Sequence, residues 1–322
     1  MLYGFFGLGG VSFKPEKDIP DLSGKVILVT GGNVGLGLET ILQLSKHNPS
    51  HIYLAARSEP KATAAIKEIQ TKVPNASITF IQCDLTSLAS VQECTTQFKT
   101  KESRLDLLFL NAGIMAVPAA TTEQGYEIQF GTNHVGHALL TKLLLPTLLK
   151  TAEQKDADVR VISLSSLGHT LGPFGGIKFD DLKTDMNTYP TSSRYGQSKL
   201  SNILFAKGLN KRYGERGITA VSVHPGVVNT NLYGTALEKY GVFGKIGGVV
   251  RDLAFTSMAD GVKNQLWAAV ANKGNAKGEV LKGEYYTPVG ISGNGNKYTG
   301  DEKLADDLWE WTEEELAGYL NV

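Results

Sequence analysis

The sequence predicts an α/β fold: a single doubly wound domain with a mostly parallel sheet and helices on both faces of that sheet. Two observations lead to this prediction. Short β-branched or aliphatic runs alternate along the chain with longer segments that carry apolar residues at helical spacing. The short runs are apolar throughout, which is typical of strands that meet water on neither side.

Six runs are strand candidates, and helix candidates lie between them. The expected strands are KVILVT (25–30), HIYLAA (51–56), SITFIQ (77–82), RLDLLFL (104–110), VRVISLS (159–165) and ITAVSV (218–223). The expected helices are GLGLETILQLSKH (35–47), KATAAIKEIQTK (61–72), SLASVQECTTQFKT (87–100) and NHVGHALLTKLLLPTLLK (133–150). Further on, DEKLADDLWEWTEEELAGYL (301–320) predicts an acidic amphipathic helix that docks on the body.

The domain is expected to run over residues 22–322, after an N-terminal arm of residues 1–21. The arm begins with MLYGFFGLGGVSF, which is apolar but shorter than the roughly 20 residues of a membrane span. It is either a packed or frayed arm, or a segment that covers the active site or contacts a membrane surface. Two long loops, at about 167–194 and 231–256, are expected to form substrate walls.

Composition excludes several classes of function. A formal net charge of +0 argues against a nucleic-acid partner. The two cysteines, Cys83 and Cys94, show no metal-ligand spacing, so packing in a reducing compartment is the better interpretation and no metal is expected. Nothing in the sequence indicates a secretory route, and we expect a cytoplasmic protein, with peripheral membrane contact through residues 1–13 as the alternative.

A glycine loop follows the first expected strand. In VILVTGGNVGLGLET, Gly31, Gly35 and Gly37 lie between that strand and the first helix. Glycines there permit a tight turn and let backbone amides and the helix N-terminus approach a pyrophosphate. The alternative is a tight turn that binds nothing.

Residues at the next strand ends extend this nucleotide hypothesis. Arg57 stands where an NAD pocket usually offers a carboxylate, and a guanidinium suits a 2′-phosphate, so NADP(H) is favoured although NAD(H) stays possible. Asp84 could accept a hydrogen bond from adenine. Asn111, Ala112 and Gly113 could let the backbone pass beneath the cofactor; each of these could also simply be a turn.

Tyr195 and Lys199 lie four residues apart in SRYGQSKLSNILF, so on a helix they share one face. They are either a catalytic pair or a surface pair on an amphipathic helix. The neighbouring motifs favour the catalytic interpretation.

Taken in order, TGGNVGLG, CDL, NAG, GTNHVGHALLT, VISLSS, YGQSK and HPGVVNT resemble the classical short-chain dehydrogenase/reductase family. The GGIKFDDL insertion indicates its retinol dehydrogenase-like branch. The resemblance implies a Rossmann-like sheet, an NAD(P) cofactor and a homodimer or homotetramer. It implies a catalytic set of Asn133, Ser166, Tyr195 and Lys199, with Ser165 in reserve. It implies cofactor contacts at Gly31, Asn33, Gly35, Leu36, Gly37, Arg57, Asp84, Leu85, Asn111, Ala112, Gly113, Tyr195, Lys199, Pro225, Gly226, Val228 and Thr230.

These residues predict an NADP(H)-dependent carbonyl reductase or alcohol dehydrogenase. Tyr195 would exchange the proton, and Lys199 would lower the pKa of that phenol, ordinarily about 10, and hold the ribose. Ser166 would stabilise the substrate oxygen, and Asn133 would anchor a water. A small or medium apolar substrate would lie against Met115, Phe174, Tyr233 and Phe243.

Two alternatives stay open within this assignment. A redox-neutral isomerase or dehydratase could use the same phenol and serine. A sensor that binds NADP(H) without turnover could retain the fold. The histidines His134, His137 and His224 are expected to be structural in any of these cases.

Overall fold

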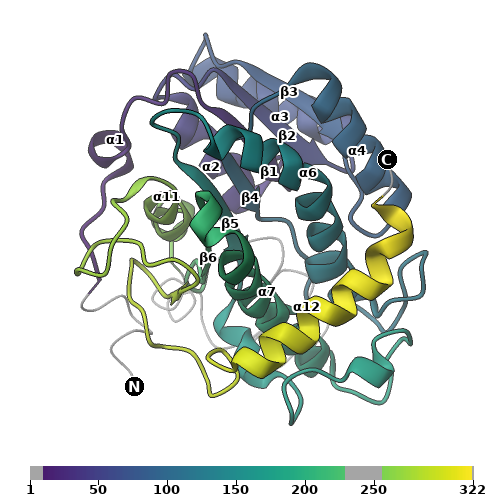
Figure 1. Ribbon diagram of the computed structural model, residues 1–322. Coiled ribbons are helices and arrows are strands. Elements are labelled where there is room, and N and C mark those ends of the chain that lie inside the picture. The colour runs from purple at the N-terminus through teal and green to yellow at the C-terminus, as the bar shows by residue number, and fades with distance from the viewer. Residues whose placement is uncertain (1–9, 229–255, 321–322) are drawn as a thin grey trace, which may run out of the picture.

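Within the described part of the chain, the sheet has seven parallel strands in the order β3-β2-β1-β4-β5-β6-β7, and the strand order reverses between β1 and β4 (Figure 1). The structure is a computed structural model that describes residues 10–228 and 256–320. The strands are β1 (Val26–Thr30), β2 (His51–Ala56), β3 (Ile78–Gln82), β4 (Leu107–Leu110), β5 (Val159–Leu164), β6 (Ile218–Val223) and β7 (Tyr285–Tyr286). The predicted doubly wound α/β domain is confirmed.

Helices cover both faces of the sheet. One hydrophobic cluster joins the sheet to α2 (Gly35–Ser45), α3 (Glu59–Lys72) and α11 (Lys263–Val270). A second cluster joins the opposite face to α4 (Leu88–Lys101), α6 (Gly136–Ala152) and α7 (Thr191–Tyr213). The described residues also contain short helical turns: α1 (Pro15–Asp18), α5 (Ile128–Phe130), a π-helical turn (Gly131–Val135), α10 (Met258–Gly261) and 3₁₀ turns at Leu167–Leu171, Phe179–Asp181, Gly214–Arg216 and Ala317–Tyr319.

All six expected strands are present, but two features differ from the prediction. Strand β3 is not buried on both faces, because it lies at the edge of the sheet, where Ile78, Thr79 and Phe80 are only half-buried. Strand β7 was not predicted. It consists of Tyr285 and Tyr286 alone, which is too short for any periodicity to show in the sequence.

The C-terminal helix α12 (Glu302–Leu316) docks on the body, as predicted. It crosses α7 and continues toward α6, as the yellow helix of Figure 1 shows. Its Trp309 is buried and stacks on Phe205 with ring centroids 5.5 Å apart and planes 12° apart. The Lys142 ammonium lies 3.9 Å from the centroid of the Trp309 ring. Aromatic stacking and cation–π contact therefore hold the helix in place.

The first long loop is shorter than predicted. Helix α7 begins at Thr191, directly after Pro190, so residues 191–194 belong to the helix and not to the loop. Proline lacks an amide proton, and its fixed φ is compatible with a position at the start of a helix. The second long loop lies outside the described residues, except for Thr256.

The described part of the N-terminal arm is packed. Phe13 and Ile19 are buried against the α2/α3/α11 side of the sheet, and the Val11 amide donates to the Val289 carbonyl at 2.8 Å. Residues 1–9 of the apolar start lie outside the described residues. Within residues 10–228 and 256–320, no helix combines the length and the apolarity needed to cross a membrane.

Candidate active site

A cavity of about 850 Å³ opens at the carboxyl edge of the sheet, where the strand order reverses between β1 and β4. Parallel sheets of this kind bind ligands at such a point. Most of the predicted site residues line the cavity: Gly31, Asn33, Gly35, Leu36, Gly37, Arg57, Asp84, Leu85, Asn111, Ala112, Gly113, Tyr195, Lys199 and Pro225. The structure thus gathers residues from five separate motifs at one place.

The remaining predicted residues lie around this cavity or outside the described residues. Asn133 does not line its wall but accepts from the amide of Ile114, which does, and Ser166 directly follows the lining residue Ser165. Gly226 has a left-handed backbone, with φ of +93°, and Val228 bridges to Thr256. Thr230 lies outside the described residues.

The glycine loop has the backbone that close approach to a phosphate requires. Gly31 has a φ of +67°, in the left-handed region that favours glycine. A side chain at Gly37 would collide with the Gly31 carbonyl oxygen, so the loop and the start of α2 pack backbone against backbone. Val34, the N-cap residue of α2, makes no side-chain capping hydrogen bond, and Gly35, Leu36 and Gly37 line the cavity there. These residues therefore fit a pyrophosphate.

Cationic side chains lie where the adenosine end of a dinucleotide would bind. Arg57 and Lys61 line the cavity after β2, which fits a phosphate group there. The Asp84 carboxylate closes β3, and its Oδ1 accepts from the Thr86 amide at 2.9 Å and the Thr86 hydroxyl at 2.8 Å. Asp84 therefore orders its own turn at the cavity wall.

The end of β1 is tied to the end of β4 by Thr30, the first residue of the TGGNVGLG motif, whose contacts were not predicted. The Thr30 hydroxyl oxygen accepts from the amides of Asn111 and Ala112 at 2.9 and 3.0 Å. The Asn111 side-chain amide donates to the Thr30 carbonyl at 2.8 Å. These bonds fix the strand ends that form the floor of the cavity.

His137, on α6, contacts the Thr30 hydroxyl that joins the ends of β1 and β4. Burial lowers the pKa of His137 to about 4, so the ring is neutral near pH 7. Its Nδ1 lies 3.0 Å from the Asn133 carbonyl, an acceptor, and therefore carries the proton. Its Nε2, 2.9 Å from the Thr30 hydroxyl, is then an acceptor. His137, like the buried His134 and His224, has a structural position, as expected.

Asn133 lies in the π-helical turn that precedes α6. Its Oδ1 accepts from the Ile114 amide at 2.8 Å, and its Nδ2 donates to the Ile114 carbonyl at 3.0 Å and to the Ser198 hydroxyl at 2.9 Å. Turns of this type are frequent at functional sites. A side chain at Gly113 would lie 3.1 Å from Asn133 Oδ1 and 3.3 Å from Lys199 Nζ, so the three residues converge.

Tyr195 and Lys199 occupy the first half of α7 and face the same space. The Lys199 ammonium lies 5.8 Å from the centroid of the Tyr195 ring and donates to the Leu164 carbonyl at 3.0 Å. Both side chains are buried. Burial lowers the pKa of Lys199 to about 8, because the charged form loses hydration.

Ser165 lines the cavity and Ser166 does not, and the two hydroxyls differ in their hydrogen bonds. The Ser165 hydroxyl donates to the Lys199 carbonyl at 2.7 Å, which commits its proton. The Ser166 hydroxyl oxygen accepts from the Gly168 amide at 3.0 Å. A side chain at Gly168 would lie 2.8 Å from Tyr195 Cε1 and 3.3 Å from Ser166 Oγ, so Ser166 adjoins the phenol.

The wall that faces Tyr195 is only partly as predicted. Met115 lines the cavity, but Phe174 does not: its side chain is 85% exposed, and the Lys297 ammonium lies 5.5 Å from its ring. Tyr233 and Phe243 lie outside the described residues. The lining residues Ile114, Val117 and Pro118 were not predicted, although NAGIMAVP is an apolar run directly after a motif residue.

Known proteins are similar to this chain in sequence and in architecture. Residues 25–177 match the family model described as short chain dehydrogenase. A short-chain dehydrogenase/reductase of Aspergillus calidoustus, drtF, is 40% identical over 310 residues, covering 92% of this chain and 95% of its own. Human retinol dehydrogenase 13 is 42% identical over 211 residues, covering 66% of this chain and 61% of its own. A crystal structure of an uncharacterized protein from Mycobacterium paratuberculosis is 28% identical with a TM-score of 0.70, covering 94% and 97% of the two chains.

These matches confirm the predicted likeness, including that to the retinol dehydrogenase-like branch, and they extend over nearly the whole chain in the Aspergillus relative. Members of this family act on small molecules with a nicotinamide cofactor, and the cavity described above has the glycine loop that such a cofactor requires. The chain belongs to the short-chain dehydrogenase/reductase family and is an oxidoreductase of that family.

Proposed function

We propose that this protein is an NADP(H)-dependent oxidoreductase that interconverts a carbonyl compound and its alcohol, with Tyr195 as the acid and base. One observation carries the proposal: Tyr195, Lys199, Ser166 and Asn133 converge around two glycines at the edge of one cavity. Each of these four side chains has a distinct chemical use in carbonyl reduction.

The cavity offers a dinucleotide two kinds of contact. The amides around Gly35 would hold the pyrophosphate, and Arg57 and Lys61 would hold a 2′-phosphate, which favours NADP(H) over NAD(H). Asp84 and Leu85 would lie beside adenine, and Pro225 near the carboxamide. When bound, the nicotinamide supplies or accepts the hydride.

The chain supplies the proton. In the direction of reduction, the Tyr195 hydroxyl donates its proton to the substrate oxygen as negative charge develops there. The positive charge of Lys199 stabilises the phenolate that remains. Ser166 accepts from the Gly168 amide, so its own hydroxyl proton is available to the same substrate oxygen. Asn133 anchors the segment beside Lys199 and would hold a water that returns the proton.

The wall beside these residues indicates the class of substrate. Ile114, Met115, Val117 and Pro118 present apolar side chains to the cavity. A charged substrate would lose hydration there without gaining a partner, which is unfavourable. We therefore favour small or medium apolar ketones, aldehydes and secondary alcohols.

Titration of the purified protein with NADPH and with NADH, followed by nicotinamide fluorescence, tests the proposal. Absorbance of the reduced nicotinamide is then recorded with a panel of ketones and aldehydes. We expect tighter binding of NADPH, consumption with apolar ketones, and loss of consumption in Tyr195→Phe while binding is retained. Binding without consumption of any substrate would favour a redox-neutral or sensor role, and absence of binding would overturn the nucleotide assignment.

A further inference from the structure

We propose that Arg194 is a positioning residue that sets the distance between the substrate wall and Tyr195. The wall is the segment Ile114–Pro118, which supplies four apolar side chains to the cavity. Resting on the oxidoreductase function proposed above, this inference assigns a determinant of substrate selectivity to a residue that does not itself line the cavity.

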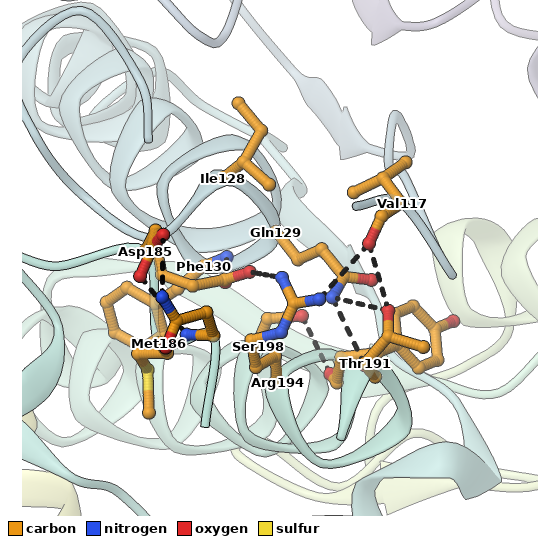
Figure 2. Close-up of polar contacts among 12 residues, drawn as sticks. Val117, Ile128, Gln129, Phe130, Asp185, Met186, Thr191, Arg194 and Ser198 are labelled. Atoms are coloured by element: carbon orange, nitrogen blue, oxygen red, sulfur yellow. Dashed lines mark hydrogen bonds and ion pairs between the residues drawn. The ribbon is translucent and has the colours of Figure 1, made fainter. Parts of the chain in front are cut away.

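Arg194 joins two separate parts of the chain. Its Nη1 donates to Glu127 Oε1 at 2.8 Å, and its Nη2 donates to the Val117 carbonyl at 3.2 Å. Figure 2 shows Arg194 grouped with Val117, Gln129 and Thr191, with dashed lines marking the contacts. Because the guanidinium is a rigid planar fork, the two bonds fix the orientation of Val117 relative to Glu127.

The ion pair is buried. Glu127 is 0% exposed and Arg194 is 4% exposed, so the pair is screened little by solvent. The second carboxylate oxygen of Glu127 accepts from the Phe130 amide at 2.6 Å, at the N-terminus of α5. The bond to the Phe130 amide therefore holds Glu127 in place independently of Arg194, and Arg194 connects Glu127 to the wall at Val117.

Further bonds hold the wall along its length. The Thr191 hydroxyl donates to the Val117 carbonyl at 3.2 Å, and Gln129 Oε1 accepts from the Ala116 amide at 3.0 Å. Ala116 has a φ of +57°, a left-handed conformation that an alanine disfavours. The surrounding bonds therefore impose this bend, since the residue itself disfavours it.

The position of Arg194 in the sequence links the wall to the chemistry. It directly precedes Tyr195, and Thr191 lies one helical turn earlier, so both contacts to Val117 come from the first turn of α7. A shift of the wall relative to this turn would change the space left for a substrate beside the phenol. Displacements of about 1 Å in such a site can lower the rate by about 100-fold.

The test replaces the pair without leaving a charge buried. In Arg194→Met/Glu127→Gln, both charges are removed, and the side-chain oxygen introduced by Glu127→Gln can still accept from the Phe130 amide. We expect kcat/KM for apolar ketones to fall by roughly 10- to 100-fold, whereas the Kd for NADPH changes by less than about twofold. The measurements are steady-state kinetics on the ketone panel and fluorescence titration with NADPH.

Two further variants separate positioning from stability. Arg194→Lys retains the charge opposite Glu127 but offers a point charge instead of a fork, so we expect it to restore the melting temperature and not kcat/KM. Thr191→Val removes the bond to the Val117 carbonyl and the bond that the Thr191 hydroxyl accepts from Gln129 Nε2, but no charge. It should reduce kcat/KM in the same direction by a smaller factor. Both variants keep the proposal testable if the double variant fails to fold.

The matched control is Arg160→Met/Asp158→Asn. Arg160 is buried like Arg194, although its partner Asp158 is 37% exposed; it pairs with Asp158 at 2.5 Å and donates to the Ala268 carbonyl at 3.0 Å, and neither Asp158 nor Ala268 belongs to the wall. Equal losses of kcat/KM in this control and in the test variant would overturn the proposal, as would a parallel loss of NADPH affinity. Wild-type turnover with unchanged selectivity in the variants overturns this inference alone, whereas a wild type that consumes no NADPH overturns the proposed function as well.

Discussion

Lys199 shows how burial alone can adjust a single side chain to its chemistry. The residue is 4% exposed, its ammonium donates to the Leu164 carbonyl, and burial lowers its pKa to about 8. The charge is therefore present below about pH 8 and is lost as the pH rises through that value. An exposed lysine would keep its charge to about pH 10.

This titration predicts a pH profile. We expect kcat/KM for ketone reduction to be level below about pH 8 and to fall tenfold per unit above it, because the phenolate then lacks its stabilising charge. In Lys199→Arg the charge persists, so the descending limb should move to higher pH even if the plateau is lower. A limb that stays near pH 8 in that variant would assign the titration to another group.

Arg57 gives a second prediction at this scale. Replacing Arg57 by alanine removes the guanidinium expected at the 2′-phosphate, and we expect NADPH to bind about tenfold more weakly, in line with the loss of one charge-assisted hydrogen bond. The Kd for NADH should not change. Lys67→Ala, an exposed residue on α3 outside the cavity, is the control and should leave both affinities unchanged. Equal weakening of both nucleotides in Arg57→Ala would contradict the NADP(H) assignment.

Single residues were predictable where a recognisable spacing accompanied them. The four-residue spacing of Tyr195 and Lys199 predicts that they lie on one helix face. The place of Gly31 and Gly37 between a strand and a helix predicts a phosphate-binding loop. Thr30 and Arg194 were not predictable in this way. Their partners lie 81 and 67 residues away in the chain, at Asn111 and Glu127, and no local pattern specifies such contacts.

At the scale of elements, periodicity identified the buried strands and long helices but not the exceptions. Strand β3 has the same apolar composition as its neighbours, and only the sheet order shows that it lies at an edge. The π-helical turn at Gly131–Val135 lies in a segment whose spacing is typical of a continuous α-helix. It depends on tertiary contacts, such as those of Asn133 with Ile114 and Ser198.

Helix α12 allows a prediction about stability. Trp309 stacks on Phe205 and lies beneath the Lys142 ammonium, so Trp309→Ala should lower the free energy of unfolding by about 3–5 kcal/mol. Urea denaturation measures this change. The exposed Glu310 on the same helix is the control, since Glu310→Ala should stay within about 0.5 kcal/mol of wild type. An effect of Trp309→Ala as small as that of the control would mean that α12 contributes little to stability.

For the molecule as a whole, the reversal of strand order between β1 and β4 determines where the cavity lies. The loops after β1, β2, β3 and β4 all open to that edge, so one ligand can contact most of the strand ends at once. Binding to the folded state alone must then stabilise the entire domain.

This linkage predicts that NADPH at about 100 times its Kd raises the free energy of unfolding by ~2.7 kcal/mol. The gain should be missing in Gly37→Ala, where a methyl group would collide with the Gly31 carbonyl oxygen. Gly300→Ala is the matched control, because a methyl group there meets no atom within 4 Å. Thermal and urea unfolding with and without NADPH provide the measurement. Equal stabilisation of both variants would place the nucleotide elsewhere.

The docking of α12 also has a consequence for folding while the chain is being synthesised. Tyr126 donates to Glu315, 189 residues later, and Gln92 donates to the Tyr319 carbonyl, 227 residues later. On the ribosome, α4, α6 and α7 are complete before the segment that covers them has been translated. The apolar surface around Phe205 therefore stays exposed until the last part of the chain has been synthesised. Apolar surfaces that are transiently exposed in this way are prone to aggregate or to bind chaperones.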